Sequence, residues 1–252
     1  MYNDLLTIGP FTLHGYGLMI AIGIILAYVV AEKRAVKFGL DPEAVWGLTV
    51  CAVVCGLAGA KLLYYITDIR AIIENPKILL NVSNGFVVYG GIISGVLCCM
   101  LYCRIRKLPF LRYADLILPS VALAQGFGRL GCFLAGCCYG NETTCALHIV
   151  FTHSDFAPNN VALIPTQLYS SGLNFLNFFV LTRIAAGSKR PGTVMTCYLL
   201  FYSIGRFIIE FFRGDLIRGS IGPFSTSQFI SLFVAAAAIL LLAGLRKRSG
   251  EV

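Results

Sequence analysis

The stretch LILPSVALAQGFGRLGCF, Leu116–Phe133, decides the fold of this chain. It is long and apolar enough to enter a bilayer, because about 20 such residues in a helix cross the hydrocarbon core. Arg129 lies inside it and cannot lose its charge. A charge at that depth costs at least about 2.5 kcal/mol, so it is kept where it pairs with or binds something. Two more cations, Lys61 and Arg206, interrupt other apolar runs. Three embedded cations indicate an anionic ligand inside the membrane, and a phospholipid headgroup is the nearest candidate.

The composition of the whole chain indicates an integral membrane protein. The 252 residues are 58% hydrophobic and 13% charged, and their mean hydropathy is +0.80. A soluble domain averages about 25% charged residues. The net charge of +8 does not indicate nucleic-acid binding, because membrane proteins collect Lys and Arg on their cytoplasmic loops.

Hydropathy predicts an all-α, polytopic fold with about seven transmembrane helices. The fifth is the least apolar, because Asn174 and Asn177 interrupt it. We expect a single transmembrane helical domain over residues 1–252, with longer outer loops near 67–85 and 136–163. The predicted spans are 15–31, 45–66, 86–102, 114–134, 164–186, 193–212 and 226–245.

The distribution of positive charge predicts the orientation of the chain. Most of the 20 Lys and Arg residues lie in the loops after the first, third, fifth and seventh spans. The positive-inside rule then places the N-terminus outside and the C-terminus in the cytoplasm. Met1–Leu13 contains no Lys or Arg, so the first span is expected to be retained and not to be part of a cleaved signal peptide.

Five polar side chains from five spans share one level in the membrane. The helix rise places them roughly 22–27 Å from the cytoplasmic ends of their spans. A common level in the outer leaflet predicts a shared site. Lys61 lies near the outer end of its span, where it could instead extend to water. The five residues are Tyr16, Lys61, Tyr89, Arg129 and Arg206.

The sixth span carries a stripe of polar side chains. Tyr202, Arg206 and Glu210 recur at every fourth residue, so they lie on one helix face with Arg213 close by. Glu210 can pair with Arg206 or Arg213 and lower the cost of burying either. This pair could be structural, but ionisable residues inside a membrane are functional by default. Arg129 has no acidic residue within one turn of its own helix.

A series of motifs is similar to the signature of the prolipoprotein diacylglyceryl transferase family. The central one is Ala114-Asp115-Leu116, Pro119, Gln125, Gly128-Arg129-Leu130-Gly131, Phe133, Gly136 and Tyr139-Gly140. The others are Gly9-Pro10-Phe11, Tyr16-Gly17-Leu18-Met19, Gly90-Gly91 with Gly95, Pro165-Thr166-Gln167-Leu168-Tyr169, and Tyr202, Arg206-Phe207 and Glu210-Phe211-Phe212-Arg213. The resemblance covers nearly the whole chain in order, and it includes seven spans.

The resemblance implies an enzyme of the bacterial cytoplasmic membrane. Members of the family transfer the diacylglyceryl group of phosphatidylglycerol to the thiol of the lipobox cysteine in a prolipoprotein, and glycerol phosphate is released. The implied partners are that lipid and the lipobox segment of a secreted precursor. No cofactor and no metal are implied.

The resemblance also assigns roles to particular residues. Arg129 and Arg206 are expected to hold the phosphate, because a guanidinium fits phosphate geometry well. Tyr16 is expected to bond the headgroup, and Glu210 to orient Arg206. Further substrate-binding residues are expected at Tyr202, Tyr89, Gln125, Gly140, Lys61 and Arg213.

Several family positions are substituted in this chain. A family histidine or glutamate could help to deprotonate the acceptor thiol. Without them a base must come from Tyr89, Glu210, a cysteine thiolate or water. The family residues Asn, Asn, Glu, His, His and Glu are replaced by Cys132, Ala135, Cys137, Tyr89, Ile164 and Ser170.

Four cysteines follow Arg129, and three interpretations of them are open. They could form a structural disulfide in an oxidising outer compartment. They could be packed or reduced thiols. One could be a reactive thiolate whose pKa is lowered by Arg129, with a covalent lipid intermediate on Cys132 or Cys137. A zinc site is also possible, but their spacing is not that of a usual zinc motif, so no metal ligand is assigned. The four are Cys132, Cys137, Cys138 and Cys145.

Two other functions compete with this assignment. The chain could be a paralogue that transfers a glycerolipid moiety to a different acceptor. It could instead be a lipid-binding or anion-binding membrane protein, or a small transporter, without chemistry. The embedded charges cluster near one face of the membrane, whereas carriers place their site near the midplane, which disfavours a transporter.

Overall fold

The computed structural model describes residues 4–8, 11–80, 85–215, 220–222 and 224–247. The chain forms two compact units. One is built from residues 1–31 together with 114–252, and the other from residues 32–113. Gly9 and Pro10 of the first family motif lie outside the described residues. The expectation of one domain over 1–252 stays a prediction.

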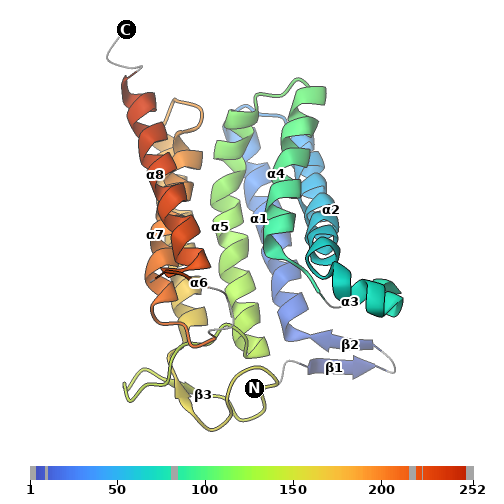
Figure 1. Cartoon of the computed structure of the whole chain (residues 1–252). Helices are drawn as coiled ribbons and strands as arrows, with labels where there is room; N and C mark the ends of the chain where they lie inside the picture. The colour runs from blue at the N-terminus through green and yellow to red at the C-terminus, as the bar shows by residue number, and fades with distance from the viewer. Residues whose placement is uncertain (1–3, 9–10, 81–84, 216–219, 223, 248–252) are drawn as a thin grey trace. The chain divides into compact units, whose positions relative to one another are not determined.

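The described chain is mainly helical, which confirms the predicted all-α membrane fold (Figure 1). The helices are α1 (Gly15–Lys37), α2 (Pro42–Thr67), α3 (Ile69–Glu74), α4 (Val88–Ile105), α5 (Phe110–Ala135), α6 (Thr166–Gly187), α7 (Thr193–Glu210) and α8 (Thr226–Lys247), with a 3-10 turn η1 (Pro76–Leu80). The strands form three short antiparallel hairpins, β1 (Asp4–Ile8) with β2 (Phe11–His14), β3 (Ile149–Val150) with β4 (Ala162–Leu163), and β5 (Ser220–Ile221) with β6 (Phe224–Ser225).

Six of the described helices, and not seven, are long and apolar enough to cross a membrane: α1, α2, α4, α5, α7 and α8. The fifth predicted span forms as α6, a helix of 22 residues. Its Asn174 and Asn177 are buried within the protein. These buried amides lower the mean hydropathy of α6. The helix is therefore not among the six because one of its faces, which other parts of the protein cover, is polar.

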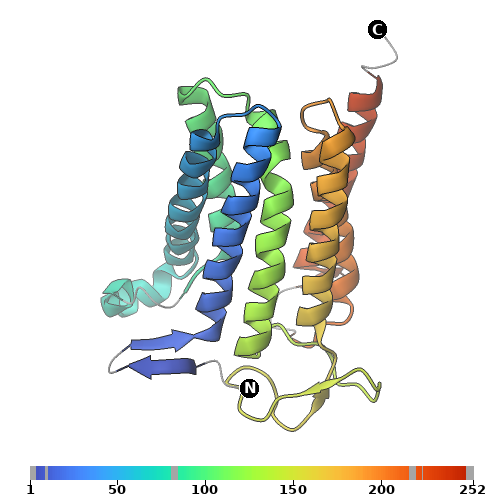
Figure 2. The ribbon, with the colours of Figure 1, turned by 180° about the vertical axis from the view of Figure 1, so that it is seen from behind.

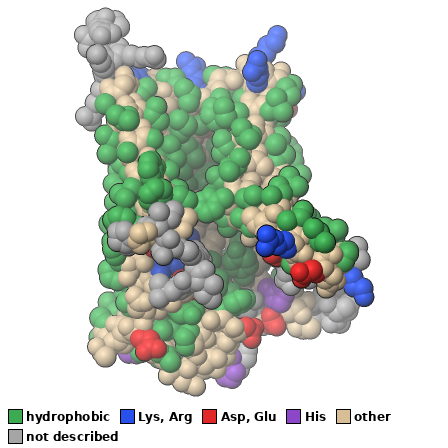
Figure 3. Space-filling model, in the orientation of Figure 1, with side chains coloured by type: hydrophobic (Ala, Val, Ile, Leu, Met, Phe, Trp, Pro, Cys, Tyr) green, Lys and Arg blue, Asp and Glu red, His purple; other side chains and the backbone are tan. Residues whose placement is uncertain are grey.

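The outer faces of the helices are apolar (Figure 3). Large hydrophobic side chains are exposed on them, as expected where lipid and not water is the solvent. Examples are Ile25, Val54, Leu97, Phe179 and Leu240.

In the unit of residues 32–113, small residues hold α2 against α4. A Cβ atom built on Gly90 would lie 2.4 Å from the carbonyl oxygen of Gly59. The Ser94 hydroxyl donates a hydrogen bond of 2.8 Å to the carbonyl oxygen of Cys55. The paired glycines of the third predicted span therefore serve close helix packing.

In the other unit, α1 and α6 pack closely against the backbone of α5. A Cβ atom on Gly23 of α1 would lie 3.1 Å from the carbonyl oxygen of Ala124 on α5. The hydroxyl of Ser171 on α6 donates a hydrogen bond of 2.9 Å to the carbonyl oxygen of Gly126 on α5. α5 therefore contacts α1 and α6 through its backbone, and this holds the turn that carries Arg129.

α7 begins against a carboxylate of α5. Asp115 accepts hydrogen bonds of 2.7 Å from the backbone N–H groups of Gly192 and of Met195. A carboxylate at a helix N-terminus satisfies free N–H groups and complements the helix dipole. From this start α7 runs between α6 and α8 and contacts both (Figure 2).

The predicted outer loops contain local structure. The segment 67–85 includes α3 and η1. The segment 136–163 includes β3 and β4 and has a small core of its own, made by Phe151, Ala157 and Leu163. This segment leads from the end of α5 to the start of α6, and it carries three of the four cysteines that follow Arg129.

Candidate functional site

A pocket of about 190 Å³ opens among α5, α6 and α7. α5 and α7 each contribute one arginine to it, so two guanidinium groups from separate helices line one cavity. The remaining lining is largely apolar, as expected for a site within the membrane. Its polar residues are Arg129, Ser170, Asn174, Asn177, Tyr202 and Arg206.

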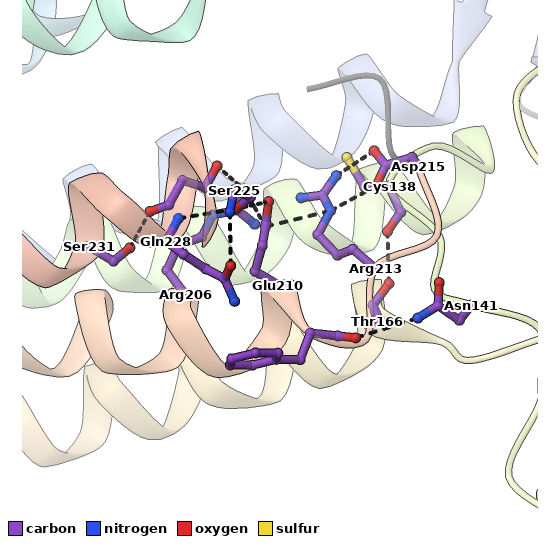
Figure 4. A network of polar contacts seen from close by, with 12 residues as sticks. Cys138, Asn141, Thr166, Arg206, Glu210, Arg213, Asp215, Ser225, Gln228 and Ser231 are labelled. Carbon is purple, nitrogen blue, oxygen red and sulfur yellow. Dashed lines mark hydrogen bonds and ion pairs between the residues drawn. The ribbon is translucent and has the colours of Figure 1, made fainter. Parts of the chain in front are cut away.

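Arg206 is held by a network at the end of α7 (Figure 4). Its Nη2 atom lies 2.8 Å from Oε2 of Glu210 and donates a hydrogen bond of 2.9 Å to Oγ of Ser227. The other carboxylate oxygen of Glu210 accepts a hydrogen bond of 3.0 Å from the hydroxyl of Ser225. The spacing of four residues predicted the ion pair, and α8 and the strand before it add the two serines.

Arg213 is buried just after α7 and belongs to the same network. Its Nε atom donates a hydrogen bond of 2.8 Å to Oδ1 of Asp215 and lies 4.0 Å from Oε2 of Glu210. Burial acts to lower the pKa of Arg213, but the hydrogen bond to Asp215 and the nearby negative charges raise it above its ordinary value. Arg213 is therefore a permanent cation.

Gly140 supports the backbone of Arg213. The two residues form an antiparallel bridge. A Cβ atom on Gly140 would lie 2.6 Å from the carbonyl oxygen of Ile164 and 2.8 Å from that of Phe212. Only glycine fits between these backbones, so Gly140 shapes the site through packing, and the expected substrate contact of Gly140 stays a prediction.

The site carries an excess of positive charge. Arg206 and Arg213 are paired with Glu210 and Asp215. Arg129 forms no ion pair with any carboxylate of the described residues. The site thus has three guanidinium groups and two carboxylates. Arg129 is the arginine without a carboxylate partner, and it lines the pocket. An anion entering the pocket would complete the neutralisation in a medium where charge is costly.

Two other predicted residues lie beside this site. The ring of Tyr16 packs over Gly131, where a built Cβ atom would lie 3.2 Å from a ring carbon. The side-chain amide of Gln125 lies near the hydroxyl of Tyr198. The Tyr198 ring stacks on that of Tyr202, with centroids 5.8 Å apart and planes at 17°. Gln125 is therefore connected to the pocket through two tyrosines and is not among its lining residues in the described chain.

Lys61 and Tyr89 belong to the unit of residues 32–113. The Nζ atom of Lys61 lies 5.1–5.2 Å from the ring centroids of Tyr64, Tyr65 and Phe86. Aromatic faces attract an ammonium group, so this unit stabilises the lysine by itself. Tyr89 is exposed in the first turn of α4. A substrate-binding role for either residue stays a prediction.

Three of the four cysteines form a cluster. The Sγ atoms of Cys132, Cys137 and Cys138 all lie within 4.8 Å of one another, whereas Cys145 is exposed and outside the cluster. All ten cysteines are described, and none of them forms a disulfide. The structure thus has a reduced cluster where one interpretation of the sequence expected a disulfide.

The thiols of Cys137 and Cys138, which follow the end of α5, have pKa values shifted in opposite directions. Hydrogen bonds from the thiols of Cys132 and Cys137, and then the charges of Arg213 and Arg129, hold the pKa of Cys138 well below its usual range. Hydrogen bonds from Cys137 to Cys132 and Cys138 raise the pKa of Cys137, since losing its proton would break them. Among the two thiols that follow α5, Cys138 is thus the one whose surroundings favour loss of its proton.

Sequence reasoning missed the contribution of α6. Ser170, Asn174 and Asn177 all line the pocket. Their spacing of four and three residues places them on one helix face, and this was visible in the sequence. The two asparagines do not merely interrupt an apolar span, because they mark the face that α6 turns to the pocket.

The chain is similar to known proteins over nearly its whole length. A sequence model of the family described as prolipoprotein diacylglyceryl transferase matches residues 3–244. A phosphatidylglycerol–prolipoprotein diacylglyceryl transferase of Clostridium tetani is 47% identical over 229 residues, which cover 91% of this chain and 92% of the relative. A second such transferase, of Clostridium perfringens, is 43% identical over 245 residues, which cover 95% of each. One of Clostridioides difficile is 32% identical over the same length.

Proposed function

Because the chain belongs to the prolipoprotein diacylglyceryl transferase family, we propose that it transfers the diacylglyceryl group of phosphatidylglycerol to the lipobox cysteine thiol of prolipoproteins. It is a multi-pass membrane protein. It works at the outer leaflet of a bacterial cytoplasmic membrane, where both the lipid and the secreted precursor are present.

One observation carries this proposal: Arg129 and Arg206 line the same pocket, and Arg129 has no carboxylate partner among the described residues. A phosphodiester headgroup supplies the missing negative charge. Arg206 and Tyr202 approach it from α7, and Arg129 from α5. Charge-assisted hydrogen bonds from guanidinium to phosphate are strong in such a dry site.

The rest of the pocket suits the apolar part of the lipid. Leu173, Leu176 and Val180 of α6 line it together with Phe201 of α7. Leu173, Leu176 and Phe201 are also exposed on the outer surface of their helices. A lipid can therefore keep its acyl chains in the bilayer while its headgroup reaches the arginines.

The reaction is a displacement at carbon. The acceptor thiolate attacks the glycerol carbon that carries the phosphate, a C–S bond forms, and the C–O bond to phosphate breaks. The electron pair of that bond leaves with glycerol phosphate, so negative charge grows on the phosphate oxygens. Fixed guanidinium groups at that position stabilise the transition state more than the ground state.

Glu210 serves the site by holding Arg206. One of its oxygens is paired with Arg206 and the other accepts the Ser225 hydroxyl. A buried carboxylate held in an ion pair with Arg206 is poorly placed to take a proton from the acceptor thiol. Of the candidates for a base, a cysteine thiolate of the adjoining cluster or water fits better.

The direct test is the transfer of labelled diacylglyceryl from phosphatidylglycerol to a lipobox peptide by the purified protein. We expect transfer by the wild type and losses of at least about 100-fold in Arg129→Ala and Arg206→Ala, because each removes a donor to developing charge. Arg183→Ala is the matched control, since Arg183 is exposed near the opposite end of α6.

Lipid binding separates the proposed function from its rival. If the wild type binds phosphatidylglycerol but no label reaches any thiol acceptor, the chain is a lipid-binding protein and the proposed transfer is wrong. If label reaches another acceptor but not the lipobox peptide, the chain is a paralogue with a different substrate.

A further inference from the structure

The backbone conformation after α5 brings the three clustered cysteines, Cys132, Cys137 and Cys138, together beside the pocket. Cys132 lies in the last turn of α5, and Cys137 and Cys138 follow the end of the helix. Gly136 has φ of 75° and Cys138 has φ of 61°. These left-handed residues turn the chain back on the helix end, so sulfurs that are five and six residues apart in sequence come within 4.8 Å.

The conformation of Cys138 is costly for a residue with a side chain. Residues other than glycine, asparagine and aspartate rarely adopt positive φ, and such strain concentrates at functional sites. Here it is maintained from α6. The hydroxyl of Thr166 and the amide of Gln167 each donate a hydrogen bond of 2.8 Å to the carbonyl oxygens of Cys138 and Cys137. The backbone that presents the sulfurs is thus fixed by buried partners.

We infer that Cys132, Cys137 and Cys138 bind a zinc ion through three thiolates, and that the fourth position of this ion takes the acceptor thiol. This inference deepens the proposed function and rests on it for the acceptor. Zinc prefers thiolate ligands in a tetrahedral arrangement with bonds of about 2.3 Å, which sets the sulfurs about 3.8 Å apart. The three sulfurs all lie within 4.8 Å of one another, so each separation exceeds that value by about 1 Å at most.

The number of sulfurs fits an open site. Structural zinc ions in proteins have four protein ligands, whereas catalytic ones have three and keep one position for a substrate. The remaining cysteine of this region, Cys145, is exposed and outside the cluster. A thiol that binds at the open position is deprotonated, and its proton passes to water at the outer face. This supplies the nucleophile that the reaction needs.

The charged groups around the cysteine cluster are also compatible with a zinc ion bound by three thiolates. Zinc with three thiolates has one net negative charge, and a fourth thiolate would add another. Arg129 and Arg213 both act electrostatically on Cys138, and Figure 4 shows Cys138 close to Arg213 and Asp215. Arg213 is already paired with Asp215, so the charge of Arg129 is the one that offsets the single negative charge of the zinc–thiolate group. Because Arg129 also lines the pocket, the cluster lies beside the proposed phosphate site.

The test uses the full-length protein in detergent, reduced and freed of metal, with Zn²⁺ and Co²⁺ as probes. We expect one equivalent of Co²⁺ to bind with tetrahedral visible bands and thiolate charge-transfer absorption, and Zn²⁺ to displace it. Cys132→Ser, Cys137→Ser and Cys138→Ser should each lose this binding. Cys145→Ser is the matched control and should retain it.

The spectrum of the Co²⁺ form also tests whether the acceptor thiol binds at the fourth coordination position of the metal. A lipobox peptide should increase the charge-transfer absorption of the Co²⁺ form, and the peptide with serine in place of cysteine should not. Absence of metal binding, or binding that survives all three cluster substitutions, overturns the inference. A spectrum unchanged by the cysteine peptide overturns the acceptor role. These measurements need no lipid, so they are independent of whether transfer from phosphatidylglycerol occurs.

Discussion

At the scale of single residues, the site depends on how each guanidinium is paired. Arg206 has Glu210 on the next turn and Ser227 from α8, whereas Arg129 faces the pocket without a carboxylate among the described residues. The guanidinium group of Arg206 is therefore held in one orientation, and that of Arg129 is available to pair with an anionic ligand. Sequence spacing could predict the pair on α7, but not the serine partners or the shared cavity, since these come from distant segments.

Replacement of Glu210 tests this division of roles. In Glu210→Gln, Arg206 loses its charged partner, and a misplacement of its guanidinium by about 1 Å is expected to lower the transfer rate by about 100-fold. Steady-state kinetics with phosphatidylglycerol and a lipobox peptide measure the effect.

Ser231→Ala controls for Glu210→Gln, because the Ser231 hydroxyl bonds only the Ser227 carbonyl oxygen of its own helix in the network. Thermal unfolding of both variants separates a loss of orientation from a loss of fold. Unchanged kinetics in Glu210→Gln would contradict the orienting role.

At the scale of elements, α6 shows how tertiary packing changes the meaning of a sequence pattern. Its asparagines reduce hydropathy, yet the helix forms over Thr166–Gly187 with those side chains inside the protein. A hydropathy window sums all faces of a helix, so it cannot distinguish a polar face turned to a site from a segment that avoids the membrane. The other six predicted spans form helices that are long and apolar enough to cross a membrane, as the sequence predicts.

The start of α7 gives a prediction at this scale. Asp115 caps two N–H groups of α7 from α5. In Asp115→Ala we expect the free energy of unfolding to fall by about 1–2 kcal/mol, because a cap and a favourable charge at the helix dipole are lost. Reversible unfolding in mixed detergent micelles measures this.

Asp155→Ala is the matched control for the cap, since Asp155 is exposed in the loop between α5 and α6. It should leave the free energy of unfolding unchanged. An equal effect of the two substitutions would mean that the cap contributes nothing beyond a surface charge.

At the scale of the whole molecule, the distribution of Lys and Arg predicts an N-terminus outside and a C-terminus in the cytoplasm. The cysteine cluster and the exposed Cys145 then lie on the outer side. This orientation is required by the proposed function, because the secreted precursor presents its lipobox there.

Labelling of intact cells tests the orientation. A membrane-impermeant maleimide should modify Cys145, and the label should be lost in Cys145→Ser. In that background, Lys189→Cys in the loop after α6 should react only after the cells are opened. Labelling of the introduced cysteine in intact cells would invert the predicted topology and place the site in the cytoplasmic half.

The sequence by itself determined the membrane class and most of the helices, and it indicated which embedded cations to examine. Apolar length dictates a helix in a medium without water, and the high cost of a buried charge singles out Arg129 and Arg206 before any coordinates are known.

The tertiary structure decided which groups meet. It joined Arg129 and Arg206 in one pocket with the polar face of α6. It also folded Cys137 and Cys138 back onto Cys132 through left-handed turns. Hydropathy and spacing contain neither fact, because contacts between helices and the direction of a turn depend on packing from distant parts of the chain.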